Sequence, residues 1–166
     1  MEKITFAVFP TLFGWMGVIA SPKGIRRLNL PVASKEIALQ DLGPEISGGI
    51  WDPSSFEKLR LKIDKYFLGE KVRFDETLDL RNDAKFFQNA WKACASIPRG
   101  ETRSYAWLAT KSGSPSAVRA AGQAMARNPV CIIIPCHRVI GSNGLLGGFG
   151  GGLDLKQRMI ELELNQ

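Results

Sequence analysis

The sequence VCIIIPCHRVIG at residues 130–141 joins an apolar run to a group of reactive side chains. The three isoleucines at 132–134 predict a short buried strand, because β-branched apolar residues favour strands. Pro135 cannot continue such a strand, so Cys136 is expected where the strand gives way to a turn. A turn at the rim of a core can present a thiol to a ligand.

The thiol of Cys136 is followed by His137, the one histidine of the chain, and by Arg138. A thiol must ionise to act as a nucleophile, and a nearby base or positive charge lowers its pKa. A buried structural cysteine beside a hydrogen-bonded histidine would give the same residue types, so these alone leave both interpretations open. Cys94, on a helical apolar stripe, and Cys131, at the start of an apolar run, fit the structural interpretation.

The composition is that of a globular protein large enough to bury a core, with 166 residues, 45% hydrophobic and 23% charged. It excludes a collagen-like protein, a disulfide scaffold and a polytopic membrane protein. Lysine and arginine number 22 against 16 acidic residues, which gives a net charge of +6. This excess is compatible with a polyanionic partner such as nucleic acid but does not require one.

The three cysteines cannot all pair within one chain, and they predict free thiols in a reducing compartment, the cytoplasm. No Cys-x-x-Cys pair exists and Cys136 is adjacent to His137, so no metal site is expected. Residues 4–20 resemble a signal peptide in their apolar character. Proline and glycine interrupt them, however, and we expect strands there instead.

The amino-terminal half predicts a strand meander followed by a helix. Strands are expected at residues 4–9, 14–20 and 25–30. Apolar residues at helical spacing predict a helix that Pro53 opens and Gly69 closes. Residues 34–52 show no clear pattern. A short strand at 72–74 and a polar linker at 75–82 complete this half.

The carboxy-terminal half is more helical. Helices are expected at residues 84–97, 104–111 and 116–127. Asp83 is the expected N-cap of the first, and Ser-Gly-Ser-Pro at 112–115 makes a turn between the other two, the outline of a helix-turn-helix. The predicted class is α/β (α+β), with a small antiparallel sheet and helix at 1–78 and a mainly helical, winged-helix-like domain at 79–166.

The third of these helices is rich in small side chains, and Arg119 and Arg127 are its only charges. The small residues are Ala117, Ala120, Ala121, Gly122, Ala124 and Ala126. They allow either tight packing against a neighbouring helix or close approach to a nucleic-acid groove, with an arginine reaching into it.

The string Pro-Cys-His-Arg at 135–138 resembles the active-site signature of the O6-alkylguanine-DNA alkyltransferases, also called methylated-DNA–protein-cysteine methyltransferases. The resemblance covers residues 85–166, and the first half is similar only in its ribonuclease-H-like layout. Further matching motifs are Gly100-Glu101-Thr102, Ser104-Tyr105, Arg119-Ala120-Ala121-Gly122, Asn128-Pro129-Val130 and the glycine-rich segment 147–153. The resemblance implies irreversible, single-turnover alkyl transfer without a cofactor. It also implies that residues 79–166 are the DNA-binding and alkyl-acceptor domain.

The resemblance also implies roles for five residues. Cys136 would accept the alkyl group, His137 would act through a water as its base, and Glu163 on the last helix would orient the histidine. Asn128 would brace the turn before the active-site segment. The phenol of Tyr105 would assist departure of the guanine anion.

The implied partner is double-stranded DNA that carries O6-alkylguanine, bound in its minor groove with the damaged base turned out. Arg119 would fill the gap in the base stack. The implied DNA-contacting residues are Arg119, Tyr105, Ala120, Ala121, Arg127 and Ser104. We expect a monomer with no membrane association, while activity on O4-alkylthymine and cooperative binding along DNA stay open.

The implied pocket departs from the usual family pattern. The carbonyls of Cys136 and Val139 would accept hydrogen bonds from the guanine amino group. Phe149 stands where tyrosine is common, and Gly150, whose N–H would lie near O6, stands where serine or alanine is usual. These smaller or less polar residues predict a roomier pocket.

One alternative belongs to a different class, a non-enzymatic lesion-binding or helix-turn-helix protein in which Cys136 is structural. Family relatives that bind lesions without transfer lack the acceptor cysteine, and this chain has it. The sequence therefore favours the enzyme, with a cytoplasmic location that would be nucleoid-associated in a prokaryote.

Overall fold

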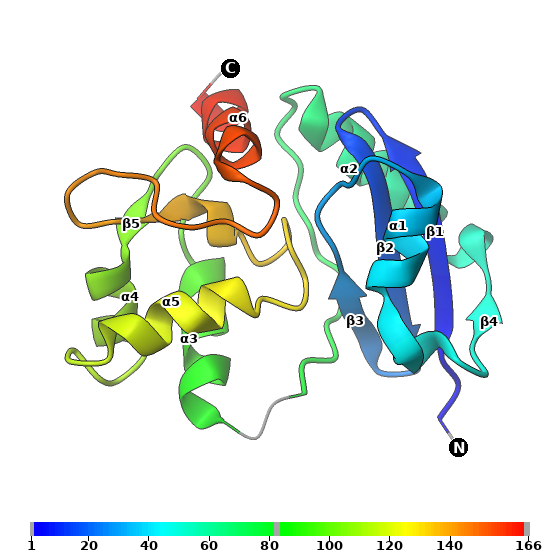
Figure 1. Ribbon diagram of the computed structural model, residues 1–166, viewed down its shortest axis with the longest axis horizontal. Coiled ribbons are helices and arrows are strands. Elements are labelled where there is room, and N and C mark those ends of the chain that lie inside the picture. The colour runs from blue at the N-terminus through cyan, green and yellow to red at the C-terminus, as the bar shows by residue number, and fades with distance from the viewer. Residues whose placement is uncertain (1, 82–83, 165–166) are drawn as a thin grey trace. The chain divides into compact units, whose positions relative to one another are not determined.

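The computed structural model describes residues 2–81 and 84–164, so the predicted cap Asp83 lies outside the described residues. The chain divides into two compact units, Met1–Arg81 and Asn82–Asn165 (Figure 1). The first is a sheet with helices and the second is mainly helical, which confirms the predicted α/β (α+β) class. No helix within the described residues is both long and apolar enough to span a membrane.

The first unit is built on a four-stranded sheet in the order β3-β2-β1-β4. Its strands are β1 (Thr5–Thr11), β2 (Gly14–Ser21), β3 (Gly24–Leu28) and β4 (Ile50–Trp51). The first three pair antiparallel and confirm the predicted meander. However, β4 pairs parallel with β1, so the sheet is mixed and not antiparallel throughout. A parallel pair needs a crossover connection, and residues 34–49, which showed no sequence pattern, provide it.

The crossover contains a helix that the sequence did not predict, α1 (Lys35–Asp41), followed by the 3-10 helix η1 (Gly43–Ile46). Ser34 caps α1 by accepting a 3.2 Å hydrogen bond from the Ile37 N–H. The helix lies so close to β2 that a Cβ on Gly17 would be 2.8 Å from a Leu42 methyl carbon. A glycine at this position therefore permits the contact.

The helix predicted between Pro53 and Gly69 is confirmed as the 3-10 helix η2 (Pro53–Phe56) continued by α2 (Glu57–Phe67). Figure 1 shows α1 and α2 on opposite faces of the sheet. Because both faces are covered, successive residues of β2 are buried instead of alternate ones. The predicted strand at 72–74 is wrong: the segment has no strand pairing, and the Phe74 ring instead lies edge-on to Tyr66.

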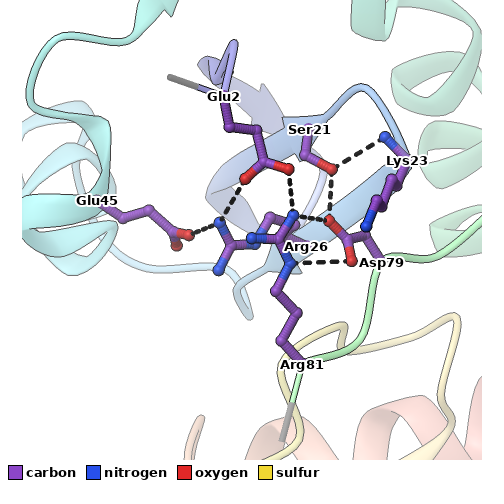
Figure 2. Close-up of polar contacts among 7 residues, drawn as sticks. All are labelled: Glu2, Ser21, Lys23, Arg26, Glu45, Asp79 and Arg81. Atoms are coloured by element: carbon purple, nitrogen blue, oxygen red, sulfur yellow. Dashed lines mark hydrogen bonds and ion pairs between the residues drawn. The ribbon is translucent and has the colours of Figure 1, made fainter.

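The segment predicted as a polar linker is tied to the sheet by charged side chains (Figure 2). Asp79 is 8% exposed, accepts a 2.5 Å hydrogen bond from the Ser21 hydroxyl, and pairs with Arg81. Arg81 also pairs with Glu2, and Arg26 pairs with Glu45 beside it. The segment is therefore an integral part of the first unit.

Replacing Asp79 by asparagine is expected to destabilise the first unit. The hydrogen bond from Arg81, opposed by burial and helped by Ser21, lowers the pKa of Asp79 from 3.8 to about 2. Its contribution is thus present above pH 4 and is lost as the pH falls toward 2. We expect Asp79→Asn to lower the free energy of unfolding by about 1–3 kcal/mol at pH 7, measured by urea denaturation.

The matched control is Asp64→Asn, because Asp64 makes a half-exposed surface pair with Arg60. Such a pair is worth at most about 1 kcal/mol. Equal losses in the two variants would show that the buried network contributes no more than a surface ion pair.

In the described part of the second unit, the α-helices α3 (Lys85–Ala95) and α6 (Leu153–Leu164) flank a helix-turn-helix made of α4 (Tyr105–Lys111) and α5 (Val118–Ala126). The predicted helix-turn-helix is confirmed as α4, a turn and α5. The indole N–H of Trp91 on α3 donates a 2.9 Å buried hydrogen bond to the Ala124 carbonyl, which fixes α3 against α5.

Two short strands connect this helix pair to the segment that carries Cys136. Strand β5 (Arg103–Ser104) pairs parallel with β6 (Val139–Ile140). Ser104 then caps α4, because its hydroxyl accepts a 3.0 Å hydrogen bond from the Trp107 N–H. The start of α4 and the residues after Cys136 are therefore held side by side.

Candidate active site

The apolar run before Cys136 is a turn and not the predicted strand. The Ile134 N–H bonds back to the Val130 carbonyl at 3.0 Å, and Ile132 has a φ of 72°. A β-branched residue is rarely found in this left-handed region. Asn128 braces the turn: its amide donates to the Ile134 carbonyl at 2.8 Å and accepts from the Val130 N–H at 3.0 Å. A short apolar run indicates burial but does not separate a turn from a strand.

The turn leads into the 3-10 helix η3 (Cys136–Arg138), which packs against α6. His137 is fully buried, and its Nε2 lies 2.5 Å from the Glu163 carboxylate on α6. Arg138 binds the same carboxylate through Nε at 2.8 Å, and its Nη1 donates to the Ile97 carbonyl at 2.6 Å. The structure thus brings His137 and Glu163 into contact directly after Cys136 in the chain.

The pKa shifts of His137 and Glu163 favour a neutral imidazole and an ionised carboxylate. Burial lowers the pKa of His137, despite the opposing hydrogen bond to Glu163. Burial would raise the pKa of Glu163, but the bonds from His137 and Arg138 outweigh it and lower the pKa to about 2. Because an ionised carboxylate can only accept, Nε2 carries the imidazole proton and Nδ1 is the basic nitrogen.

None of the three cysteines forms a disulfide, but their environments differ. Burial raises the pKa of the Cys94 thiol well above its ordinary value. The pKa of Cys136 is lowered, first by a hydrogen bond from Cys131, with burial opposing it and Asn128 and the charge of Lys156 adding to it. Cys136 is therefore a buried thiol suited to act as a nucleophile.

One site residue was missed by the sequence analysis, Lys156 on α6. It is fully buried, and its ammonium donates to the carbonyls of Val139 at 2.7 Å, Gly148 at 3.2 Å and Leu146. The signal was available in the sequence, because Lys156 precedes the buried Met159 by three residues on one face of the helix. A lysine in an apolar helix stripe needs polar partners.

Comparison with known proteins covers both halves of the chain. Residues 4–80 match the family described as 6-O-methylguanine DNA methyltransferase, ribonuclease-like domain, and residues 85–165 match its DNA binding domain. The methylated-DNA–protein-cysteine methyltransferase of Methanosarcina acetivorans is 36% identical over 158 residues, which is 95% of this chain and 97% of that protein. The chain belongs to the methylated-DNA–protein-cysteine methyltransferase family.

Further members of this methyltransferase family are similar to this chain. The enzyme of that name from Mycobacterium bovis is 49% identical over 112 residues, covering 68% of this chain and 67% of that protein. A crystal structure of Mycobacterium tuberculosis OGT in complex with DNA matches with a TM-score of 0.83 and 36% identity, covering 96% of this chain and 92% of that chain. The predicted family resemblance is thereby confirmed.

The residues predicted to contact DNA in this methyltransferase do not all face solvent. Arg119 on α5 and Arg127, the residue after its end, are exposed, and the Arg127 guanidinium lies over the Phe87 ring at 5.7 Å. Ala120 is half-buried, but the Ala121 side chain is fully buried in the unit's core and is not available for the predicted contact. The small residues of α5 thus serve helix packing as well as leaving an accessible face.

The predicted pocket residues of the methyltransferase gather in part around Lys156. Its ammonium lies 5.6 Å from the Tyr105 ring centroid and 5.7 Å from that of Phe149. The Val139 carbonyl, predicted to accept from guanine, already accepts from Lys156 but has a second lone pair. Gly150 is exposed in the loop that precedes α6.

Proposed function

We propose that this chain repairs DNA by moving the alkyl group of O6-alkylguanine irreversibly onto Cys136, once per molecule. One observation carries the proposal: Cys136 is buried and is followed by His137, whose Nε2 lies 2.5 Å from the buried Glu163 carboxylate. This is the nucleophile, base and orienting group that thiol chemistry requires. Membership of the methyltransferase family identifies the reaction.

The transfer proceeds by one displacement at the alkyl carbon. His137 takes the thiol proton at Nδ1 through a water, and Glu163 stabilises the imidazolium that forms. Sγ of Cys136 then bonds to the alkyl carbon as the bond from that carbon to O6 breaks. Tyr105 gives its phenol proton to the departing guanine. A thioether is a poor leaving group, so Cys136 is not regenerated.

The pocket residues are assigned in the same proposal. Phe149 stacks on the extruded guanine, and the carbonyls of Cys136 and Val139 accept hydrogen bonds from its amino group. The Gly150 N–H lies near O6. Asn128 maintains the conformation of the turn that precedes Cys136. Its two side-chain hydrogen bonds to the backbone support this role.

The exposed face of α5 enters the minor groove, where small residues permit close approach of the helix backbone. Arg119 occupies the space that the extruded base leaves. Ala120, Arg127, Ser104 and Tyr105 complete the DNA contacts. The second unit acts as the DNA-binding and alkyl-acceptor domain, and the first unit acts as a structural brace. The first unit includes Asp79 and Arg81, so it extends past the predicted boundary at residue 78.

We expect Arg119→Ala to slow repair of O6-methylguanine in duplex DNA by about tenfold or more, because unstacking a base costs a few kcal/mol. Repair of the free base O6-methylguanine needs no extrusion and is expected to change little. Single-turnover rates on both substrates make the comparison. Arg73→Ala, which removes the same charge from an exposed site in the first unit, is the control. An equal loss on both substrates would reject the role of Arg119.

The proposed acceptor is tested by moving a labelled methyl group from duplex DNA to protein. The variants Cys94→Ala and Cys131→Ala are expected to become labelled in one-to-one amounts, because neither thiol is the acceptor. Cys131→Ala should react more slowly, since it loses the hydrogen bond that lowers the pKa of Cys136. A protein that binds the damaged duplex but acquires no label would belong to the lesion-binding class.

The cellular location follows from the same chemistry. The thiols of Cys94, Cys131 and Cys136 form no disulfide, and an acceptor thiol must stay reduced. We propose that the chain works as a monomer in the cytoplasm, associated with the nucleoid if the source is prokaryotic.

A further inference from the structure

The ammonium of Lys156 is a buried charge that takes part in none of the proton transfers of the displacement described above. A buried cation is unfavourable unless hydrogen bonds replace its water. Here the carbonyls of Val139, Leu146 and Gly148 all accept from Nζ. A neutral amine has two N–H groups and an ammonium has three, so three carbonyl acceptors favour the charged form.

The same ammonium faces the phenol of Tyr105. Nζ lies 3.4 Å from the hydroxyl oxygen, a long contact in which Lys156 is the donor. The Gly148 backbone N–H also bonds to this oxygen. Gly147 holds the ring from another side, because a Cβ there would lie 2.9 Å from a Tyr105 ring carbon. The phenol oxygen therefore lies in a fixed position beside the Lys156 ammonium and the Gly148 N–H.

The phenol holds its proton firmly in this environment. Burial raises the pKa of Tyr105, a charge on Cys136 raises it further, and the Gly148 N–H lowers it only in part. A phenolate left here after proton donation would be costly without a nearby positive charge. The ammonium of Lys156 supplies that charge without having to move.

We propose that Lys156 is a positioning residue for Tyr105: its ammonium, with the Gly148 N–H, stabilises the phenolate formed when Tyr105 gives its proton to the departing guanine. The inference rests on the proposed function. The O–H bond of Tyr105 breaks, its electron pair stays on oxygen, and the proton goes to guanine. The thiol proton resides on His137, nothing is oxidised or reduced, and the solvent later restores both groups.

The groups that face Lys156 are Tyr105 from α4, and Cys136 and His137 from η3. Burial lowers the pKa of Lys156 to about 8, although a charge on Cys136 opposes this. Lys156 is therefore charged at pH 7 and loses its charge above pH 8. The methyl-transfer rate of the wild-type protein should fall over that range.

Two reactions of the same thiol separate the roles of Lys156. Methyl transfer from O6-methylguanine DNA needs a proton on its leaving group, whereas alkylation of Cys136 by iodoacetamide releases iodide and needs none. We expect Lys156→Met to slow methyl transfer by about tenfold to a hundredfold and the iodoacetamide reaction by much less. Lys156→Arg keeps the charge, and is expected to restore part of the transfer rate and to remove its fall above pH 8. Lys58→Met, at an exposed position of α2, is the charge-matched control.

A double variant tests whether Lys156 acts through Tyr105. In a Tyr105→Phe background no phenolate forms, so adding Lys156→Met is expected to cause little further loss of methyl transfer. Additive losses, or equal losses in methyl transfer and iodoacetamide alkylation, would overturn the inference and place the effect on the thiol.

If Lys156→Met does not fold, the rates of the wild-type protein measured against pH test the inference instead. A fall in methyl transfer above pH 8 with no parallel fall in iodoacetamide alkylation supports the inference, and parallel profiles contradict it. If the wild-type thiol reacts with iodoacetamide but never with the damaged DNA, the proposed function itself has failed.

Discussion

Replacement of Cys136 by alanine is expected to abolish alkyl transfer completely while leaving the affinity for damaged DNA nearly unchanged. The displacement needs a thiolate at this position, and the methyl side chain offers no nucleophile. Cys136 is 5% exposed and small, so its loss creates little cavity. Fluorescence anisotropy with a duplex containing O6-methylguanine measures binding, and label transfer to protein measures reaction.

The outcome of this variant separates the two classes of protein that the sequence left open. A Cys136→Ala protein that still removes methyl groups would show that another group is the acceptor. Loss of DNA binding together with transfer would show that the thiol supports the fold instead. Thermal unfolding of the same variant distinguishes these cases, because a folded protein with no activity retains its transition.

Replacing Glu163 by glutamine is expected to cause the second-largest loss, in both rate and stability. Its carboxylate is almost fully buried and binds both His137 and Arg138. An amide cannot stabilise an imidazolium as a carboxylate does, so we expect transfer to slow by about a hundredfold or more. Removing one charge from a buried pair also leaves the guanidinium uncompensated, which costs about 3–5 kcal/mol.

The pH dependence of stability gives this variant its own signature. Because the folded-state pKa of Glu163 is about 2 and its ordinary value is 4.5, its stabilisation is present above pH 4.5 and is lost as the pH falls toward 2. Urea denaturation from pH 7 to pH 2 measures the free energy of unfolding. Its fall with decreasing pH should be smaller in Glu163→Gln. Glu161→Gln, at an exposed position of α6, is the control. If Glu163→Gln left both the alkyl-transfer rate and the pH dependence of the free energy of unfolding unchanged, the role of the carboxylate would be contradicted.

Sequence patterns predicted the elements that turn residues bound clearly. The three-strand meander and the helix-turn-helix are such elements. The helix α1 escaped because its seven residues bury only Ala38, too few to show a period. The strand β4 consists of Ile50 and Trp51, both exposed, and becomes a strand only through pairing with β1.

Only those active-site residues that belong to family motifs could be predicted from the sequence. Resemblance assigned Cys136, His137 and Glu163, and it could not show the bonds that the fold makes between them. The resemblance also assigned Ala121 to DNA contact, because a matching motif does not show which face of its helix is buried. Lys156 was missed because most lysines are solvated, and only the packed structure shows its three carbonyl partners.

The most direct test is the intact mass of the protein after reaction with an oligonucleotide duplex that carries O6-methylguanine, followed by peptide mapping. The account predicts the addition of one methyl group, located on Cys136, with saturation at one per chain even when DNA is in excess. A protein that binds the oligonucleotide but keeps its original mass, or that carries the methyl group on another residue, would contradict it.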